Sequence, residues 1–352
     1  MGIKSVEIQN FKSIKDSGKI ELGNINVLVG ANSAGKSNII EFFKLLKKIS
    51  DSQLQLYVGV NGGTDNILHF GRRKSDYLFG AISFNNDDQS EYKFKLICDN
   101  VDGLIFEEEA YSDKGSPVKN TTYAKKETLV LVNKDMFLSK YFNSFRVYHF
   151  NDTSFNSKIK TLSYLSDCRY LHEDGSNIAS LLYRFKHQYP KDFEIFEYTI
   201  KSVSPFFNNL YLAPYELNEE MILLRFIENE MIFPASSLSD GILRFICLAS
   251  ILLFPEKPLT IFLDEPELGL HPFAIEKLGA MIEVASTDSQ IIISTQSVDL
   301  INQFSADDII VVKREDDETK FERQSEKDLE NWLENYSIGE IWRSNIIGGT
   351  PL

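Results

Sequence analysis

The sequence has few cysteines and no long apolar run. Its three cysteines, Cys98, Cys168 and Cys247, are far apart and lack the close spacing of metal-binding or redox pairs. We therefore expect free thiols in a reducing cytoplasm rather than a disulfide or zinc framework. No stretch approaches the roughly 20 apolar residues of a membrane span, and the N-terminal residues lack the apolar core of a signal peptide. These absences favour a cytoplasmic protein without a membrane segment.

Positive charge is also scarce. The chain of 352 residues has 37 Lys and Arg against 51 Asp and Glu, which gives a formal net charge of −14. This balance argues against a protein whose whole surface coats nucleic acid, because phosphate contacts depend on Lys and Arg. A local basic groove is still compatible with the composition, so nucleic-acid binding remains an open alternative. The apolar fraction of 43% is ordinary for a globular protein and is enough for a sizeable core.

One stretch near the start carries recognisable chemistry. Residues 25–40 read INVLVGANSAGKSNII, which is a short apolar run, the pattern G-x-x-x-x-G-K-S and an amphipathic stretch. This order predicts a strand, a phosphate-binding loop (the P-loop, Gly30–Ser37) and a helix. Backbone N–H groups of the loop and the helix dipole would bind phosphate, Lys36 would reach the β- and γ-phosphates, and the Ser37 hydroxyl would ligate Mg²⁺. The expected nucleotide-binding residues are Gly30, Asn32, Ser33, Ala34, Gly35, Lys36, Ser37 and Asn38.

An acidic pair follows a buried strand in the second half of the chain. Residues 259–263 are continuously apolar, as in a strand buried on both faces, and they lead into Asp264 and Glu265. Asp264 could hold Mg²⁺ opposite Ser37, and Glu265 could orient and deprotonate the attacking water. The alternative is a strand-end acidic pair that only faces solvent. The P-loop earlier in the chain favours the catalytic interpretation.

Two further stretches are ambiguous by themselves. Ser239-Asp240-Gly241 precedes a strongly apolar helix, and Ser239 would cap it and leave N–H groups for a second phosphate contact. The same string is equally typical of an ordinary N-cap. Another apolar strand spans 290–293, and Gln296 after it could sense the γ-phosphate, although a glutamine at a strand end is more often structural. Alternating strands and helices, with polar residues after the strands, predict an α/β fold with a mainly parallel sheet flanked by helices.

The remaining regions indicate insertions into that sheet. Short strand-like runs between residues 62 and 146 predict an inserted antiparallel sheet, and residues 150–206 have the periodicity of a helical subdomain. We expect one domain over residues 1–352, divided into an N-terminal lobe, a helical insertion and a C-terminal lobe (1–149, 150–206 and 207–352). Further strands are expected at 210–212, 221–227 and 231–233. The tail, residues 337–352, could pack on its own domain or dock on a partner.

The order of these motifs resembles the ABC-type ATPase heads of the SMC, RecF and OLD group. The shared strings are NFKSI, GANSAGKS, SLSDG, DEPELGLHP and ISTQS, and they extend over nearly the whole chain. The resemblance implies a P-loop NTPase that uses ATP and Mg²⁺ and dimerises head to head around two ATP molecules. It implies that the signature segment of one subunit, Ser239-Asp240-Gly241, contacts the nucleotide on the other subunit's P-loop. It also implies that Lys12, beside the first strand, lies near the nucleotide.

Several features depart from that group. The switch position, often His in ABC proteins, is Gln296, which predicts slow hydrolysis or a larger role for Glu265. The signature reads LSDG rather than LSGG, which keeps Ser239 and Gly241. The Q-loop glutamine has no clear position, since Gln53 and Gln55 are candidates without further support. The sequence also contains no long heptad arm and no segment that resembles the TOPRIM nuclease of the OLD enzymes.

These features lead to three functional hypotheses. The first is an ATP-hydrolysing switch that forms a homodimer and controls a separate effector chain, such as a nuclease or toxin. The run DGSNIASLLYRFK resembles small bacterial ATPases of this group that are linked to anti-phage defence, so defence is the expected context. The second is a RecF-like DNA repair clamp, which would need a basic groove. The third is a nucleotide-binding scaffold with negligible turnover, motivated by Gln296.

Overall fold

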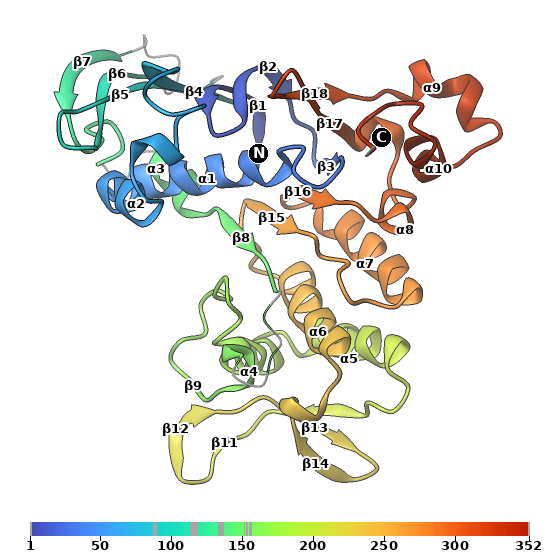
Figure 1. Cartoon of the computed structure of the whole chain (residues 1–352). Coiled ribbons are helices and arrows are strands. Elements are labelled where there is room, and N and C mark those ends of the chain that lie inside the picture. The colour runs from blue at the N-terminus through green and yellow to red at the C-terminus, as the bar shows by residue number, and fades with distance from the viewer. Residues whose placement is uncertain are drawn as a thin grey trace. The chain divides into compact units, whose positions relative to one another are not determined.

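The chain forms two compact units, and Figure 1 shows the elements of each. The first unit comprises Met1–Val147, Pro258–Asp264 and Ser289–Leu352, and the second comprises Tyr148–Lys257 and Glu265–Asp288. The computed structural model describes residues 2–86, 90–112, 119–132, 137–150, 152, 154 and 157–350.

The P-loop belongs to a mainly parallel sheet in the first unit. In the described residues this sheet has the strand order β18-β17-β3-β16-β15-β8. β17, β3, β16 and β15 are parallel neighbours, while β18 returns antiparallel to β17. Nearly all residues of β3, β15 and β16 are buried, as expected for strands covered on both faces. The bounds are β3 Ile25–Val29, β8 Arg146–Tyr148, β15 Thr260–Asp264, β16 Gln290–Thr295, β17 Ile309–Glu315 and β18 Glu318–Arg323.

A second, antiparallel sheet completes this unit, with the order β2-β1-β4-β5-β6-β7. The inserted strands pair with the N-terminal hairpin through β1 and β4, so the predicted antiparallel sheet is present. Its strands are β1 Ile3–Phe11, β2 Ile14–Glu21, β4 Tyr77–Phe84, β5 Glu91–Cys98, β6 Leu104–Ser112 and β7 Lys119–Lys125. The helices of the unit are α1 Lys36–Ser50, α2 Leu54–Val60, α3 Phe137–Asn143, α8 Val298–Ile301, α9 Glu326–Leu333 and α10 Ile338–Arg343.

Helix α1 lies between the two sheets, and its adjacent residues Phe42 and Phe43 pack on different sheets. The Phe42 ring packs on Phe11 and Phe94 of the antiparallel sheet, with centroid distances of 5.7 and 6.1 Å. The Phe43 ring packs on Phe262 of β15, with a centroid distance of 4.6 Å. The helix that begins at the P-loop is therefore anchored in the core of the unit.

The C-terminal tail packs on its own unit. Ile338, Ile341 and Trp342 of α10 are buried, and the N–H of Ala31 in the P-loop donates a hydrogen bond of 2.6 Å to the carbonyl O of Gly349. Of the two alternatives for this segment, the structure shows packing on the chain's own unit up to Thr350. The last two residues lie outside the described part.

The second unit combines four helices with two small sheets in its described residues. Its helices are α4 Ile178–Gln188, α5 Pro190–Val203, α6 Asp240–Leu253 and α7 Pro272–Ala285. One sheet contains β10 Asn209–Tyr211, β13 Arg225–Glu228 and β14 Met231–Pro234, and the other contains β9 Ser163–Tyr164, β11 Pro214–Tyr215 and β12 Asn218–Ile222. In the part of the chain that the structure describes, no helix has the length and apolarity needed to span a membrane.

One predicted strand is wrong. The run at 221–227 is not a single strand, because β12 ends at Ile222 and β13 begins at Arg225 in a different sheet. Ile222, Leu224 and Phe226 are all buried, so the period of two continues across the break. Alternation of apolar residues reports burial on one face and does not reveal that the chain changes sheets.

Candidate nucleotide site

The P-loop connects β3 to α1 as its sequence predicts, and the two glycines of its motif, Gly30 and Gly35, are confined by neighbouring groups. Gly35, the N-cap of α1, has a left-handed φ of 109°, which favours glycine. A Cβ at Gly35 would overlap the Thr319 Oγ1, and a Cβ at Gly30 would overlap the carbonyl O of Val312. Packing against β17 and β18 therefore requires glycine at both ends of the loop.

Lys36 is buried and its side chain turns back over the loop. Its Nζ donates hydrogen bonds to the carbonyl O of Gly30 at 2.7 Å and of Ala31 at 3.1 Å. Ser37, the next residue, is exposed in the first turn of α1, as are Asn32 and Ser33 in the loop. The ammonium group of Lys36 is thus held beside the N-terminus of α1. The positive charge and the helix N-terminus both favour binding of an anion.

The parallel register brings the end of β15 to the same sheet edge as the P-loop. Asp264 is paired with Ser294 of β16, and Ser294 is paired with Leu28 of β3. The Ser294 hydroxyl donates a hydrogen bond to Asp264 Oδ1, which holds this carboxylate at the strand end. Because carboxyl ends of parallel strands share one edge, Asp264 and the P-loop lie at the same edge of the sheet.

Gln296 lies at that edge too, directly after β16. The preceding residue, Thr295, is buried, and its hydroxyl accepts a hydrogen bond of 3.0 Å from the N–H of Ser297. Ser297 then caps α8 by accepting from the N–H of Leu300 at 3.3 Å. The position of Gln296 is therefore defined by a fixed turn between β16 and α8.

Lys12 lies in the turn between β1 and β2, with a left-handed φ of 50°. Its Nζ is 3.6 Å from Glu41 Oε2 on α1. Glu41 lies four residues beyond Ser37, which is about 6 Å along the helix axis. The carbonyl O of Lys12 is 2.8 Å from Nδ1 of His69. The turn that contains Lys12 therefore lies along the first turns of α1. His69 also holds this turn, a contact that the sequence motifs do not predict.

In the second unit, the signature segment and the turn after β15 pack together. A Cβ at Gly241 would lie only 2.5 Å from the carbonyl O of Gly269. Arg244 Nη1 donates a hydrogen bond of 2.7 Å to the carbonyl O of Leu268. Glu265 begins this turn with a left-handed φ of 46°, an uncommon conformation for a residue other than glycine. No local sequence pattern indicates that Arg244 links the two segments.

Ser239 caps α6, as predicted, by accepting a hydrogen bond of 3.4 Å from the N–H of Ile242. Ser239 and Asp240 are exposed, and Asp240 Oδ1 lies 3.7 Å from Lys160 Nζ. Asp264 and Glu265 are adjacent in sequence, but the first ends a segment of the first unit and the second begins a segment of the second.

The two Q-loop candidates lie beyond the far end of α1. Gln53 Oε1 accepts a hydrogen bond of 2.9 Å from Lys48 Nζ, and Gln55 Nε2 donates to the carbonyl O of Leu104 at 2.7 Å. Helix α1 has 15 residues, which separates these glutamines from the P-loop by about 22 Å of helix axis. Their contacts support the α2 region rather than the P-loop.

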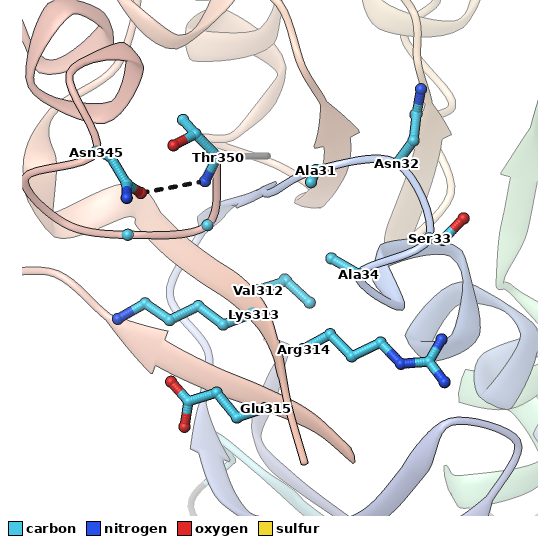
Figure 2. Close-up of a pocket in the computed structure, with 12 residues that line it drawn as sticks. Ala31, Asn32, Ser33, Ala34, Val312, Lys313, Arg314, Glu315, Asn345 and Thr350 are labelled. Carbon is cyan, nitrogen blue, oxygen red and sulfur yellow. Dashed lines mark hydrogen bonds between the residues drawn. The ribbon is translucent and has the colours of Figure 1, made fainter. Parts of the chain in front are cut away.

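A pocket of about 490 Å³ flanks the P-loop. In Figure 2, Arg314 extends toward the side of the loop that carries Ser33 and Ala34, whereas Lys313 and Glu315 point the other way. The pocket lies between three segments, namely 31–34 of the P-loop, 312–315 of β17, and the tail with Asn345 and 348–350.

A parallel sheet with a P-loop after a central strand and an aspartate at the end of a nearby strand defines the class of P-loop NTPases. Residues 25–302 match the family described as "AAA domain, putative AbiEii toxin, Type IV TA system". Because this match spans most of the sequence, the chain belongs to that family.

Two curated relatives agree with this assignment. The "ATP/GTP phosphatase" of Helicobacter pylori is 22% identical over 294 residues, which cover 76% of this chain and 77% of the relative. The "Old nuclease" of Escherichia phage P2 is 25% identical over 371 residues and covers 90% of this chain. The match spans 60% of the length of that nuclease.

Solved structures of SMC heads share the fold. A head bound to the C-winged helix domain of ScpA has a TM-score of 0.64 at 17% identity and covers 93% of this chain and 99% of its own. An SMC head with an extended coiled coil, bound to the C-terminal domain of ScpA derived from Pyrococcus furiosus, has a TM-score of 0.60 at 15% identity, with coverages of 95% and 99%. The SMC head domain from Thermotoga maritima has a TM-score of 0.50 at 15% identity, with coverages of 92% and 100%. The predicted class, an ABC-type ATPase of the SMC, RecF and OLD group, is confirmed.

Proposed function

We propose that this protein is a cytoplasmic ATPase switch that dimerises head to head on Mg²⁺-ATP and controls a separate effector protein. The observation that carries the proposal is the shared edge of the parallel sheet. There the P-loop, with Lys36 held over it, follows β3, and Asp264 ends β15 of the same sheet. This arrangement suits a phosphate chain on the loop and a cation beside it.

The residues at this edge fit Mg²⁺. Among the described residues, no group of three or more His, Cys, Asp or Glu side chains could hold a metal ion. Mg²⁺ is commonly held by one or two carboxylates together with substrate phosphates and waters. Asp264 and the exposed Ser37 hydroxyl are suitable protein ligands, and the ion would neutralise charge that develops on the phosphates.

Hydrolysis requires a group that positions water beside the γ-phosphate. We assign this role to Glu265, because it follows Asp264 directly and a carboxylate can accept the proton of the attacking water. Its left-handed backbone is consistent with a functional position, where such conformations are concentrated. Gln296 would contact the γ-phosphate through its amide, and because an amide is a poor base at neutral pH, we expect slow turnover.

Dimerisation would complete the site. Ser239 and Asp240 are exposed at the start of α6, a helix of 14 residues whose N-terminus favours anions. We propose that this signature segment contacts the ATP that is bound to the P-loop of a second copy. Within the chain, the close approach of Gly241 to Gly269 joins this segment to the turn that begins at Glu265.

An effector and a defence role are the most specific parts of the proposal. The family description names a toxin and a toxin–antitoxin system, and one relative is a phage-encoded nuclease. Two similar SMC heads were solved with a domain of ScpA bound. These names support an ATPase that acts with a nuclease or toxin. Copurification with the product of the adjacent gene, with and without ATP, tests this part: ATP-dependent retention is expected, and its absence contradicts it.

The central experiment replaces Glu265 by Gln in the full chain. We expect the variant to bind ATP, to lose at least about 100-fold in turnover, as for removal of a general base, and to accumulate as an ATP-bound dimer. Light scattering coupled to size-exclusion chromatography measures the mass, and phosphate release measures turnover. Glu276→Gln, the same change at an exposed position on α7, serves as the matched control and should behave as the wild type.

The outcomes separate the alternatives. Turnover that Glu265→Gln abolishes excludes the low-turnover scaffold. A variant that binds ATP but stays monomeric, or one that hydrolyses ATP at the wild-type rate, contradicts the switch.

A further inference from the structure

Behind the P-loop, one buried hydroxyl joins three segments of the first unit. Thr319 of β18 is fully buried, and its Oγ1 donates a hydrogen bond of 2.9 Å to the carbonyl O of Ala34. The same oxygen is 2.6 Å from the Ser13 Oγ in the turn between β1 and β2. Asn38 Nδ2, in the first turn of α1, donates to this Ser13 Oγ at 2.5 Å.

The direction of each hydrogen bond in this network follows from proton counting. A threonine hydroxyl has one proton, and Thr319 uses it on the Ala34 carbonyl. Ser13 must therefore donate to Thr319, which leaves a lone pair of Ser13 to accept from Asn38. The network runs from Asn38 through Ser13 and Thr319 to the P-loop backbone.

The last bond of the network orients one peptide of the P-loop. The Ala34–Gly35 peptide is planar and trans, so its C=O and its N–H point in opposite directions. Since the Ala34 carbonyl points toward Thr319, the Gly35 N–H points away from Thr319. Backbone N–H groups of this loop are the groups that cradle phosphates in P-loop proteins.

Shape reinforces the hydrogen bond. A Cβ added at Gly35 would overlap Oγ1 of Thr319 and would lie 2.8 Å from its Cγ2, so this side chain fills the space behind the left-handed residue. The N–H of Thr319 also donates a hydrogen bond of 2.9 Å to the carbonyl O of Ser13. Hydroxyl, methyl and backbone of Thr319 therefore all contact the segments around the loop.

The strand that carries Thr319 is itself held in place. Glu318 Oε1 pairs with Lys15 Nζ at 2.5 Å, and Glu318 Oε2 pairs with Lys320 Nζ at 2.9 Å. Hydrogen bonds from Lys15 and Lys320 lower the pKa of Glu318 to about 2, so this carboxylate is ionised near neutral pH. The ion pair between Glu318 and Lys15 links β18 to β2 next to the Thr319–Ser13 contact, because Glu318 precedes Thr319 and Lys15 lies two residues after Ser13.

We propose that Thr319 is a positioning residue of the nucleotide site: it holds the Ala34–Gly35 peptide so that the Gly35 N–H faces the bound phosphates. The inference rests on the proposed nucleotide binding at the P-loop. Thr319 acts through the peptide and does not touch the nucleotide. A misdirected Gly35 N–H weakens diphosphate and triphosphate binding equally, because both contain the phosphates that the loop binds.

Thr319→Val tests this directly, because it replaces the hydroxyl by a methyl group of similar size. We expect the Kd of ADP, measured by calorimetry, to rise about tenfold, since without the hydrogen bond to the Ala34 carbonyl the Gly35 N–H is no longer held toward the phosphates. The KM of ATP should rise by a similar factor with little change in kcat, as when an interaction common to the ground and transition states is lost. Thr319→Ser keeps the hydroxyl and should restore the Kd of ADP to within about twofold of the wild type.

Thr260→Val is the matched control. Thr260 is also fully buried in the first unit, and its hydroxyl is 2.9 Å from the Tyr141 hydroxyl on α3, away from the P-loop. The Thr260→Val variant should be less stable than the wild type but should bind ADP with the same affinity. If Thr319→Val does not fold, Ser13→Ala, which removes the hydroxyl that donates to Thr319, should raise the Kd of ADP about threefold.

The results distinguish this inference from the proposed function. A wild-type chain that does not bind ADP contradicts nucleotide binding itself. Wild-type binding with an unchanged Kd in Thr319→Val, or an equal loss in Thr260→Val, overturns the role of Thr319. The same holds if Thr319→Ser binds ADP as weakly as Thr319→Val.

Discussion

Replacing Gly241 by Ala tests how strongly packing shapes the signature segment. The added Cβ would lie 2.5 Å from the carbonyl O of Gly269, well inside the 3.4 Å at which ordinary van der Waals contact begins. The obstructing atom belongs to the backbone and cannot rotate away. Overpacking of this kind costs about 1–3 kcal/mol, whereas the preference of helices for Ala over Gly favours the variant by at most about 1 kcal/mol. We expect the free energy of unfolding to fall by about 1–2 kcal/mol.

Urea unfolding of the full chain, followed by circular dichroism at 222 nm, measures this loss. Gly59→Ala is the control for helix preference alone, because Gly59 is an exposed residue of α2 and an added Cβ meets nothing within 4 Å. It should stabilise the protein by up to about 1 kcal/mol. If Gly241→Ala unfolds at the same or a higher urea concentration than the wild type, with an unchanged slope, the packing argument is refuted.

Two further predictions concern the core and a thiol. Phe262→Ala should lower the free energy of unfolding by about 3–5 kcal/mol, because the ring packs on Phe43 and Phe145; tryptophan fluorescence in urea measures this, and a loss below about 1 kcal/mol contradicts it. Burial raises the pKa of the Cys247 thiol to about 12, so iodoacetamide at pH 8 should leave this residue unmodified in the native protein and modify it in urea. Peptide mass mapping measures the modification of Cys247. If the native protein is modified as fast as the unfolded protein, the burial of this thiol in α6 is contradicted.

The sequence was sufficient for features that depend on local patterns. The strand before Gly30 and the helix after it were predictable because the apolar period changes at the P-loop. The strand before Asp264 was predictable because a strand buried on both faces is continuously apolar. The Ser239 cap was predictable because hydroxyl side chains accept from free N–H groups at helix starts.

Contacts between distant segments were not predictable in this way. The hydrogen bond from Thr319 to Ala34 joins residues 285 positions apart, and the hydrogen bond from Ala31 to Gly349 joins the P-loop to the tail. A threonine in a short polar strand and a glycine pair in a tail have ordinary local interpretations, such as solvent exposure or a turn. Only the pairing of β18 with β17, and of β17 with β3, brings Thr319 to the P-loop.

The close packing around Gly30 and Gly35 changes how variants of this motif should be interpreted. A side chain at either position would collide with Val312 or Thr319 whether or not a nucleotide is bound. Loss of activity in a glycine variant therefore reports disturbed architecture as much as lost phosphate contacts. A substitution at Ser37 separates the two effects more cleanly, because this side chain is exposed, whereas Lys36 is buried and also holds the loop carbonyls. By the same reasoning, a descendant that had lost nucleotide binding would still be under selection to keep both glycines while the β17–β18 hairpin remained. The two glycines of the motif therefore reflect the shape of the fold, whereas the exposed Ser37 reflects nucleotide binding.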